Sequence, residues 1–304
     1  MDTRILIGTE GGLWKLDRSG LKRVESLGKH PITAVAREEA RTWAIVNGRS
    51  VFETGGNGAW RERATVEGPA ATCLAQTPAG LLVGTEEAHL LRVVDGKLTP
   101  VESFETVEGR KKWYTPWGDP ADARSIAIGG DGAIHVNVHV GGVVRSRNAG
   151  RTWTPTIDVD ADVHQVLAHP TRREVVLVAA YEGFGVSRDA GDSWRFANAG
   201  LQAHYLRAVA VSAETVLVSA STGPGGRRSA IYRKPLDGGA RFERCRDGLP
   251  EWFDDNVDTA CLAARGSLVV FGTEDGRVFQ SPDGGERWKL VAEDLPPVHC
   301  VTVR

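Results

Sequence analysis

The chain has 304 residues, of which 37 are basic and 39 are acidic, and its formal net charge is −2. Such a balance gives no positive excess for a polyanion, so we expect neither nucleic-acid binding nor adhesion to an anionic membrane. No apolar stretch approaches about 18 residues, and the first residues lack a basic region followed by an apolar run, so we expect no membrane span and no export signal. The four scattered cysteines lack a Cys-x-x-Cys pair and are expected to be buried free thiols of a cytoplasmic protein.

An eight-residue box recurs along the chain. Three copies have the form Ser-x-Asp/Asn-x-Gly-x-x-Trp and begin at Ser146, Ser187 and Ser281, and two weaker copies occupy 53–60 and 235–242. A repeat of about 40 to 50 residues is typical of propeller blades. Asp or Asn can accept hydrogen bonds within a tight turn, Gly allows positive φ, and Trp buries a large ring. We therefore expect the box to close a hairpin in each blade.

Short β-type runs, separated by Gly, Asp and Asn, surround each box. The clearest unit has runs at 123–128, 133–140 and 143–146, followed by the box and a fourth strand. No segment shows a helical period over 11 or more residues, so almost no helix is expected. Aligning the first strand of each unit gives seven copies, which begin at Thr33, Thr72, Arg124, His164, Arg207, Thr259 and His299.

The alignment predicts an all-β fold, a single seven-bladed β-propeller of four-stranded antiparallel blades spanning 1–304. Residues 298–304 should supply the inner strand of a blade whose other strands lie within 3–27, which removes exposed sheet edges. The remaining blades are expected, in chain order, at 31–66, 70–105, 121–157, 161–197, 204–245 and 256–291.

The boxes resemble the Asp-box (BNR) repeats of sialidases, xyloglucan-active glycosidases, sortilin-type ectodomains and photosystem assembly propellers. The resemblance covers nearly the whole chain, and it implies that the boxes lie on the propeller edge, away from a ligand. The Phe/Tyr-Arg-Ile-Pro motif of sialidases is matched only by Tyr232–Pro235, which runs into the weak box at 235–242. Sialidases are also normally six-bladed, so true sialidase activity is not expected.

Departures from the repeat at the expected ligand face indicate where function lies. The tripeptide Gly-Thr-Glu ends three second strands, at 8–10, 84–86 and 272–274, which favours an architectural role. The fourth and fifth blades depart from it there. The candidate catalytic residues are His139, His164, Tyr181 and Glu182.

Arginines and aromatic side chains extend this candidate site. Arginines among the first-strand positions suit a carboxylate or phosphate group. Two long insertions, 106–121 and 246–257, are rich in aromatic residues, which suit either a sugar or a protein partner. The candidate ligand-binding residues are Arg124, Arg207, His204, His299, Trp113, Tyr114, Trp117 and Trp252.

A metal site would require histidines from different blades. His135 and His139 lie on one strand about 13 Å apart, too far to share an ion. The candidate metal ligands are His139, His164 and His204, and the alternative is hydrogen-bonded histidines in a polar funnel. Three functions stay open: a carbohydrate-active or small-anion-binding protein, such as a hydrolase or lyase; a non-catalytic protein-interaction platform; and a metalloenzyme.

Overall fold

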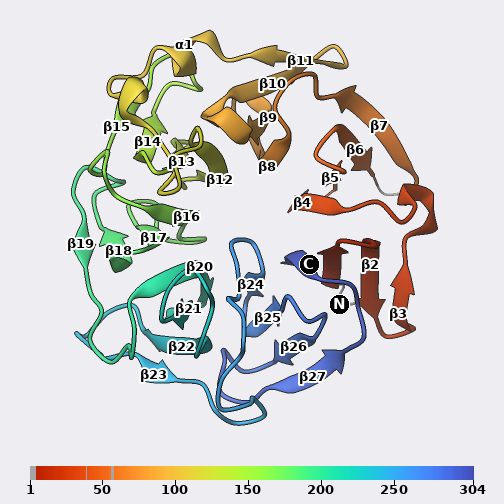
Figure 1. The fold of residues 1–304 in the computed structure, drawn as a ribbon, viewed down its shortest axis with the longest axis vertical. Helices are drawn as coiled ribbons and strands as arrows, with labels where there is room; N and C mark the ends of the chain where they lie inside the picture. Colours follow the sequence, from red (N-terminus) through yellow and green to blue (C-terminus); the bar gives the residue numbers. More distant parts are fainter. Residues whose placement is uncertain (1–4, 39, 56–57) are drawn as a thin grey trace. The chain divides into compact units, whose positions relative to one another are not determined.

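The structure is a computed structural model that describes residues 5–38, 40–55 and 58–304. The fold is a seven-bladed β-propeller of four-stranded antiparallel blades, as the repeat predicts (Figure 1). Asn57, in the weak box copy at 53–60, lies outside the described residues. The chain forms two compact units, which we call the four-blade unit (Thr33–Ala180 with Gly185–Phe196) and the three-blade unit (Met1–Ile32, Tyr181–Phe184 and Ala197–Arg304).

Sixteen strands build the first four complete blades in chain order. They are β4 (Ile32–Arg37), β5 (Thr42–Val46), β6 (Ser50–Thr54) and β7 (Trp60–Thr65); β8 (Ala71–Thr77), β9 (Gly80–Thr85), β10 (Leu90–Val94) and β11 (Lys97–Pro100); β12 (Asp122–Ile128), β13 (Ile134–His139), β14 (Gly142–Ser146) and β15 (Thr154–Pro155); β16 (Val163–Ala168), β17 (Val176–Ala180), β18 (Gly183–Ser187) and β19 (Arg195–Phe196). Among the described residues, helix is confined to α1 (Glu102–Glu105) and the 3-10 turns η1 (Glu25–Leu27), η2 (Glu86–Ala88) and η3 (Arg110–Lys112).

The remaining blades include the one that joins the two ends of the chain. They comprise β20 (Tyr205–Ser212), β21 (Thr215–Ser221), β22 (Ala230–Pro235) and β23 (Glu243–Arg244); β24 (Leu262–Arg265), β25 (Leu268–Gly272), β26 (Val278–Ser281) and β27 (Lys289–Ala292); and β28 (Val298–Val303) with β1 (Ile5–Thr9), β2 (Gly12–Asp17) and β3 (Gly20–Arg23). β28 pairs antiparallel with β1, with Ile5 opposite Val303 and Ile7 opposite Val301. The predicted closure is confirmed.

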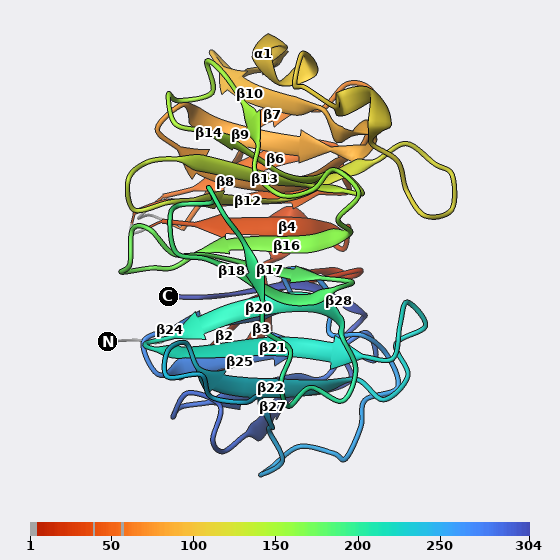
Figure 2. The same cartoon turned by 90° about the vertical axis from the view of Figure 1, so that its left-hand side faces the viewer.

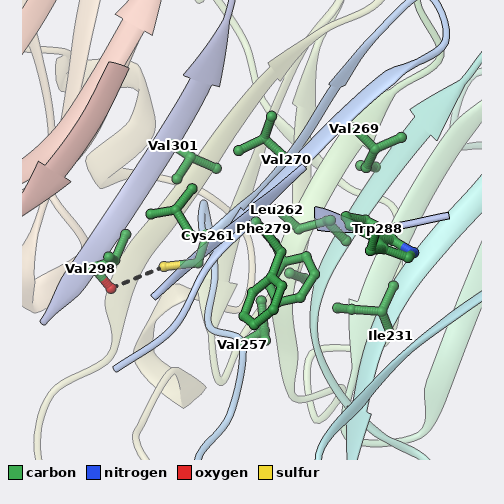
Figure 3. Close-up of a cluster of buried hydrophobic side chains, with 14 of the residues drawn as sticks. Ile231, Val257, Cys261, Leu262, Val269, Val270, Phe279, Trp288, Val298 and Val301 are labelled. Carbon is green, nitrogen blue, oxygen red and sulfur yellow. Dashed lines mark hydrogen bonds between the residues drawn. The ribbon is translucent and has the colours of Figure 1, made fainter. Parts of the chain in front are cut away.

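Each unit has its own apolar core, because the second strand of a blade is covered on both faces. Every residue of β1 and of β13 is buried. In the three-blade unit, the rings of Phe279 and Trp288 pack among aliphatic side chains from several strands (Figure 3). In the four-blade unit, the edge of Trp153 meets the ring of Phe104, with the ring centroids 5.1 Å apart.

The box closes the turn between the third and fourth strands. Ser146 Oγ accepts from the Gly150 amide at 2.8 Å, and Asn148 Oδ1 accepts from the Thr152 amide at 2.9 Å. The copies at 187–194 and 281–288 repeat both contacts. These groups therefore satisfy backbone amides of the hairpin, which is a structural role.

Side chains of the first two strands of a blade reach a backbone carbonyl of the next blade. In the four-blade unit, Asn137 Nδ2 donates to Val163 O at 2.7 Å, and Cys73 Sγ lies 3.4 Å from Ala123 O. In the three-blade unit, Ser219 Oγ donates to Val257 O at 2.7 Å. There too, Cys261 Sγ lies 3.3 Å from Val298 O, the contact drawn in Figure 3. We call these four contacts the interblade bridges.

The Gly-Thr pair of the recurring tripeptide is architectural, as expected. A Cβ at Gly84 would lie 2.6 Å from Cys73 Sγ, and one at Gly272 would lie 2.4 Å from a methyl of Val298. Thr9, Thr85 and Thr273 are buried and hydrogen-bond carbonyls of the following loop. Within the described part of the chain, no helix has the length and apolar character needed to cross a membrane.

Candidate functional site

Two histidines and an aspartate gather in the four-blade unit. His139 ends β13 and is 2% exposed, and His164 lies in β16 and is fully buried. Asp162 precedes β16, and its Oδ1 lies 2.8 Å from His139 Nε2 and 3.3 Å from His164 Nε2. The ligand atoms of the three residues all lie within 4.8 Å of one another. We call these residues the His-Asp-His cluster.

Sequence reasoning named the two histidines but missed Asp162. The residue stands two positions before His164 in Asp-Val-His, and alternate residues of an extended strand point to the same face. That spacing is the signal that could have found it. The third predicted metal ligand, His204, belongs to the three-blade unit, where its side chain is exposed, and its role stays a prediction.

Several of the predicted first-strand positions lie at β-bulges. The register of β16 against β17 shifts between Val163 and Gln165, which leaves His164 as the extra residue. The register of β12 against β13 shifts in the same way around Arg124, and that of β8 against β9 shifts around Thr72. A bulge frees a residue from the ladder and re-aims its side chain.

The surroundings of the cluster shift the pKa values of two neighbouring carboxyl groups, Asp162 and Asp122, in opposite directions. Burial raises the pKa of Asp162, but contact with His139 and His164 outweighs it, so the pKa lies below its usual range. Burial raises the pKa of Asp122, the cross-strand partner of His139, and nearby Arg124 only partly opposes that shift. Burial also lowers the pKa of His139, against the opposing effect of Asp162. At neutral pH the cluster therefore holds an ionised Asp162 beside a neutral His139.

Residues 113–119, which we call the aromatic loop, contact the end of β13. The amide of Tyr114 donates to Val140 O at 3.1 Å, and the amide of Val140 donates back to Tyr114 O at 2.5 Å. Thr115 bonds Asp119 O through both its amide and its hydroxyl at 2.9 Å, which tightens the turn between them. The ring centroid of Trp117 lies 5.6 Å from that of His139, although Trp117 is 60% exposed. Figure 2 shows this loop extending beyond the strand ends of its unit.

The aromatic residues predicted in this loop divide by their packing. Trp113 packs inward, with its ring 5.7 Å from that of Phe104 and the Arg110 guanidinium 4.9 Å above it. Tyr114 is 44% exposed and Trp117 is more so. A planar ligand can therefore reach Tyr114 and Trp117 more readily than Trp113.

The other predicted site residues lie in the three-blade unit. Arg207 Nη1 lies 3.1 Å from Asp258 Oδ1, and the Arg207 guanidinium lies 5.2 Å from the Tyr205 ring. Tyr181 is 59% exposed and meets Tyr205 edge-on. Glu182 is exposed, His299 Nε2 lies 3.5 Å from Glu10 Oε2, and the Arg244 guanidinium lies 4.2 Å from the Trp252 ring. Their ligand-binding and catalytic roles stay predictions.

Comparison with solved structures supports the propeller fold. The xyloglucanase of glycoside hydrolase family GH74 from Xanthomonas campestris matches with a TM-score of 0.71 at 15% identity, over 95% of this chain but 52% of that one. YCF48 bound to a D1 peptide matches with a TM-score of 0.60 at 15% identity, over 86% of this chain and 82% of that one.

A structure of the nidogen/laminin complex matches with a TM-score of 0.58 at 10% identity, over 99% of this chain and 98% of that one. No protein-family model matches the chain, and comparison with curated proteins gives no match. The likenesses therefore establish the fold, and the function must be argued from the site.

Proposed function

We propose that this chain is an Asp-box propeller that binds a carbohydrate-class ligand beside the His-Asp-His cluster and acts on it as a glycoside hydrolase or lyase. One observation carries the proposal: Trp117 is held against His139 and yet remains 60% exposed. Exposing a large ring to water is unfavourable, so a fixed and exposed Trp beside buried ionisable groups is suited to a ligand that covers it.

The chemistry around Trp117 favours a sugar, and an acidic one in particular. The apolar face of a sugar ring can stack on an indole while its hydroxyls reach polar side chains. Arg124 lies close enough to lower the pKa values of both Asp122 and His139 through its charge. Positive charge beside an aromatic platform suits a carboxylate-bearing sugar such as a uronic acid.

The two aspartates supply groups for acid–base cleavage. Glycosidases commonly use one carboxyl that keeps its proton and one that is ionised. Burial favours the protonated form of Asp122, whereas contact with two imidazoles favours the ionised form of Asp162. In our proposal Asp122 donates a proton to the leaving oxygen, and Asp162, when no metal is bound to it, accepts the proton that the attacking water loses.

The test combines a glycan array of neutral and uronate-containing oligosaccharides with calorimetry on the best binder. Trp117→Ala should weaken binding about tenfold, the order expected for loss of one stacking contact. Phe196→Ala is the matched control, because Phe196 is an exposed aromatic residue of the outer strand β19 in the same unit. Asp122→Asn should retain binding and lose turnover. Equal affinities for Trp117→Ala and the unchanged protein would refute the proposed site.

A second candidate function is peptide or protein binding through the same loop. Tyr114 and Trp117 are both exposed, and exposed aromatic pairs are typical of interaction hot spots. The YCF48 propeller, to which this chain is similar in fold, is described with a D1 peptide bound. If no glycan binds, a peptide library screened against the unchanged protein and the Tyr114→Ala/Trp117→Ala variant will decide whether this loop selects peptides.

A further inference from the structure

The His-Asp-His cluster brings three potential metal ligands together on neighbouring blades. His139 and His164 come from β13 and β16, and Asp162 comes from the residues immediately before β16. Their ligand atoms lie within 4.8 Å of one another, and two of these separations are 2.8 and 3.3 Å. Two imidazoles and one carboxylate form a ligand set common to catalytic zinc and non-haem iron centres.

We propose that His139, Asp162 and His164 bind one divalent transition-metal ion, with Zn²⁺ as the preferred class. In a tetrahedral zinc site with bonds of about 2.0–2.1 Å, neighbouring ligand atoms stand about 3.3 Å apart. The separation between Asp162 Oδ1 and His164 Nε2 equals this value, and that between Asp162 Oδ1 and His139 Nε2 needs to open by only about 0.5 Å.

The carboxylate oxygen supplies an independent observation. Asp162 Oδ1 is shielded from water, and its contacts with the two imidazole nitrogens, at 2.8 and 3.3 Å, are close but poorly aligned for hydrogen bonds. A buried ionised oxygen without an aligned donor is costly. A cation placed among the three ligands would compensate that charge without requiring an N–H to point at it.

The spacing of the ligands is fixed by the backbone. The interblade bridge from Asn137 Nδ2 to Val163 O joins β13 two residues before His139 to β16 between Asp162 and His164. Ser125 Oγ accepts from the Val166 amide at 2.9 Å, which joins β12 to β16 as well. Ligands held on strands by such bonds lose little freedom when a metal binds, and this raises affinity.

The site would remain open to a further ligand. Three protein ligands leave at least one coordination position for water or a substrate oxygen, as in catalytic zinc sites. The Asp162 side chain is 16% exposed, and the exposed ring of Trp117 contacts His139. Solvent can therefore reach the proposed metal site beside Asp162.

The experiment uses the tag-free full chain, stripped with a chelator and dialysed. Titration with Zn²⁺ against a chromophoric chelator should give one bound ion per chain, and Co²⁺ loading should give visible d–d bands of a low-symmetry, four- or five-coordinate centre. His139→Gln and His164→Gln should each lower the affinity for zinc at least tenfold. His135→Gln is the matched control, a buried histidine on the same strand and about 13 Å away.

Circular dichroism establishes that each variant is folded, and if a histidine variant fails, Asp162→Asn replaces it. Failure of the unchanged protein to bind either metal, or binding by the variants equal to that of His135→Gln, would overturn the proposal and indicate a hydrogen-bonded His-Asp-His network. The inference does not rest on the proposed function. Zinc binding without glycan binding, or the reverse, tells the two apart.

Discussion

Asn137 Nδ2 donates to the carbonyl oxygen of Val163 at 2.7 Å, linking the strand that ends in His139 to the strand that carries His164. Asn137 is fully buried, so removing its amide leaves that carbonyl without its side-chain donor. We expect Asn137→Ala to lower the free energy of unfolding by about 1–3 kcal/mol, measured by urea denaturation.

Asn256→Ala is the control, because Asn256 Nδ2 donates to the Gly223 and Pro224 carbonyls in a surface loop. That change should cost about 0.5 kcal/mol or less. If the cluster binds zinc, Asn137→Ala should also lower the affinity for zinc about 10- to 100-fold, because contacts that support metal ligands contribute this much. Unchanged stability and affinity would show that the bridge does not position the site.

Stability should fall in acid because of His135. The imidazole is fully buried, both ring nitrogens lack a hydrogen-bond partner among the described residues, and burial, with Arg145 nearby, lowers its pKa to about 4 from 6.5. The unfolded chain therefore binds this proton more tightly than the folded protein. The contribution of His135 is constant above pH 6.5, and stability is lost as the pH falls from there to about 4.

The difference of about 2.5 pKa units corresponds to roughly 3 kcal/mol. Urea denaturation of the unchanged protein and of His135→Gln between pH 7.5 and 4 measures it. The variant should show the flatter pH dependence, even if its stability at pH 7.5 is lower. If the stabilities of the two proteins changed with pH in parallel, His135 would not be the source of the loss in acid.

Gly84→Ala should destabilise the four-blade unit. The new Cβ would lie 2.6 Å from Cys73 Sγ and 2.9 Å from Ala123 Cβ, so the interblade bridge must move. We expect a loss of about 1–3 kcal/mol, typical of overpacking, in denaturant unfolding. Gly225→Ala is the control, since none of the described atoms lies within 4 Å of its added Cβ. A similar effect at both positions would argue against close packing at Gly84.

Removal of the last eight residues should disrupt the blade that joins the two ends. The deletion takes away β28 and leaves β1 without its partner, and an exposed apolar strand edge promotes aggregation. The truncated chain should lose its cooperative thermal transition or melt far below the full chain, and light scattering should show association. If calorimetry gave the same melting transition for the truncated chain and the full chain, β28 would contribute little to stability.

The fold could be predicted because the propeller repeats its signals. The boxes at Ser146, Ser187 and Ser281 and the alternation of strands and turns fix the blade number without any distant contact. The site could be predicted only in part. His139 and His164 stood out as departures from the repeat, whereas Asp162 lies in the polar run Asp-Val-Asp-Ala-Asp, where nothing but its spacing from His164 distinguishes it.

The sequence also could not show which aromatic side chains of the insertion are packed and which are exposed. Trp113 and Trp117 stand four residues apart in one insertion, and their sequence context is similar. Packing against Phe104 and Arg110 leaves Trp113 half-buried, whereas Tyr114 and Trp117 are exposed. Such tertiary contacts have no local sequence signal.

The four cysteines, of which Cys73 and Cys261 form interblade bridges, can report when the blades open. All four thiols are buried, and burial raises the pKa of Cys73 to about 12, so a thiol reagent can react only when the surrounding blades separate. Cys73 lies in the four-blade unit, and Cys245, Cys261 and Cys300 lie in the three-blade unit. Pulsed thiol labelling read by mass spectrometry would thus measure the rate at which each unit opens. It would also show whether a ligand beside His139 slows the labelling of Cys73 alone or of the cysteines in both units.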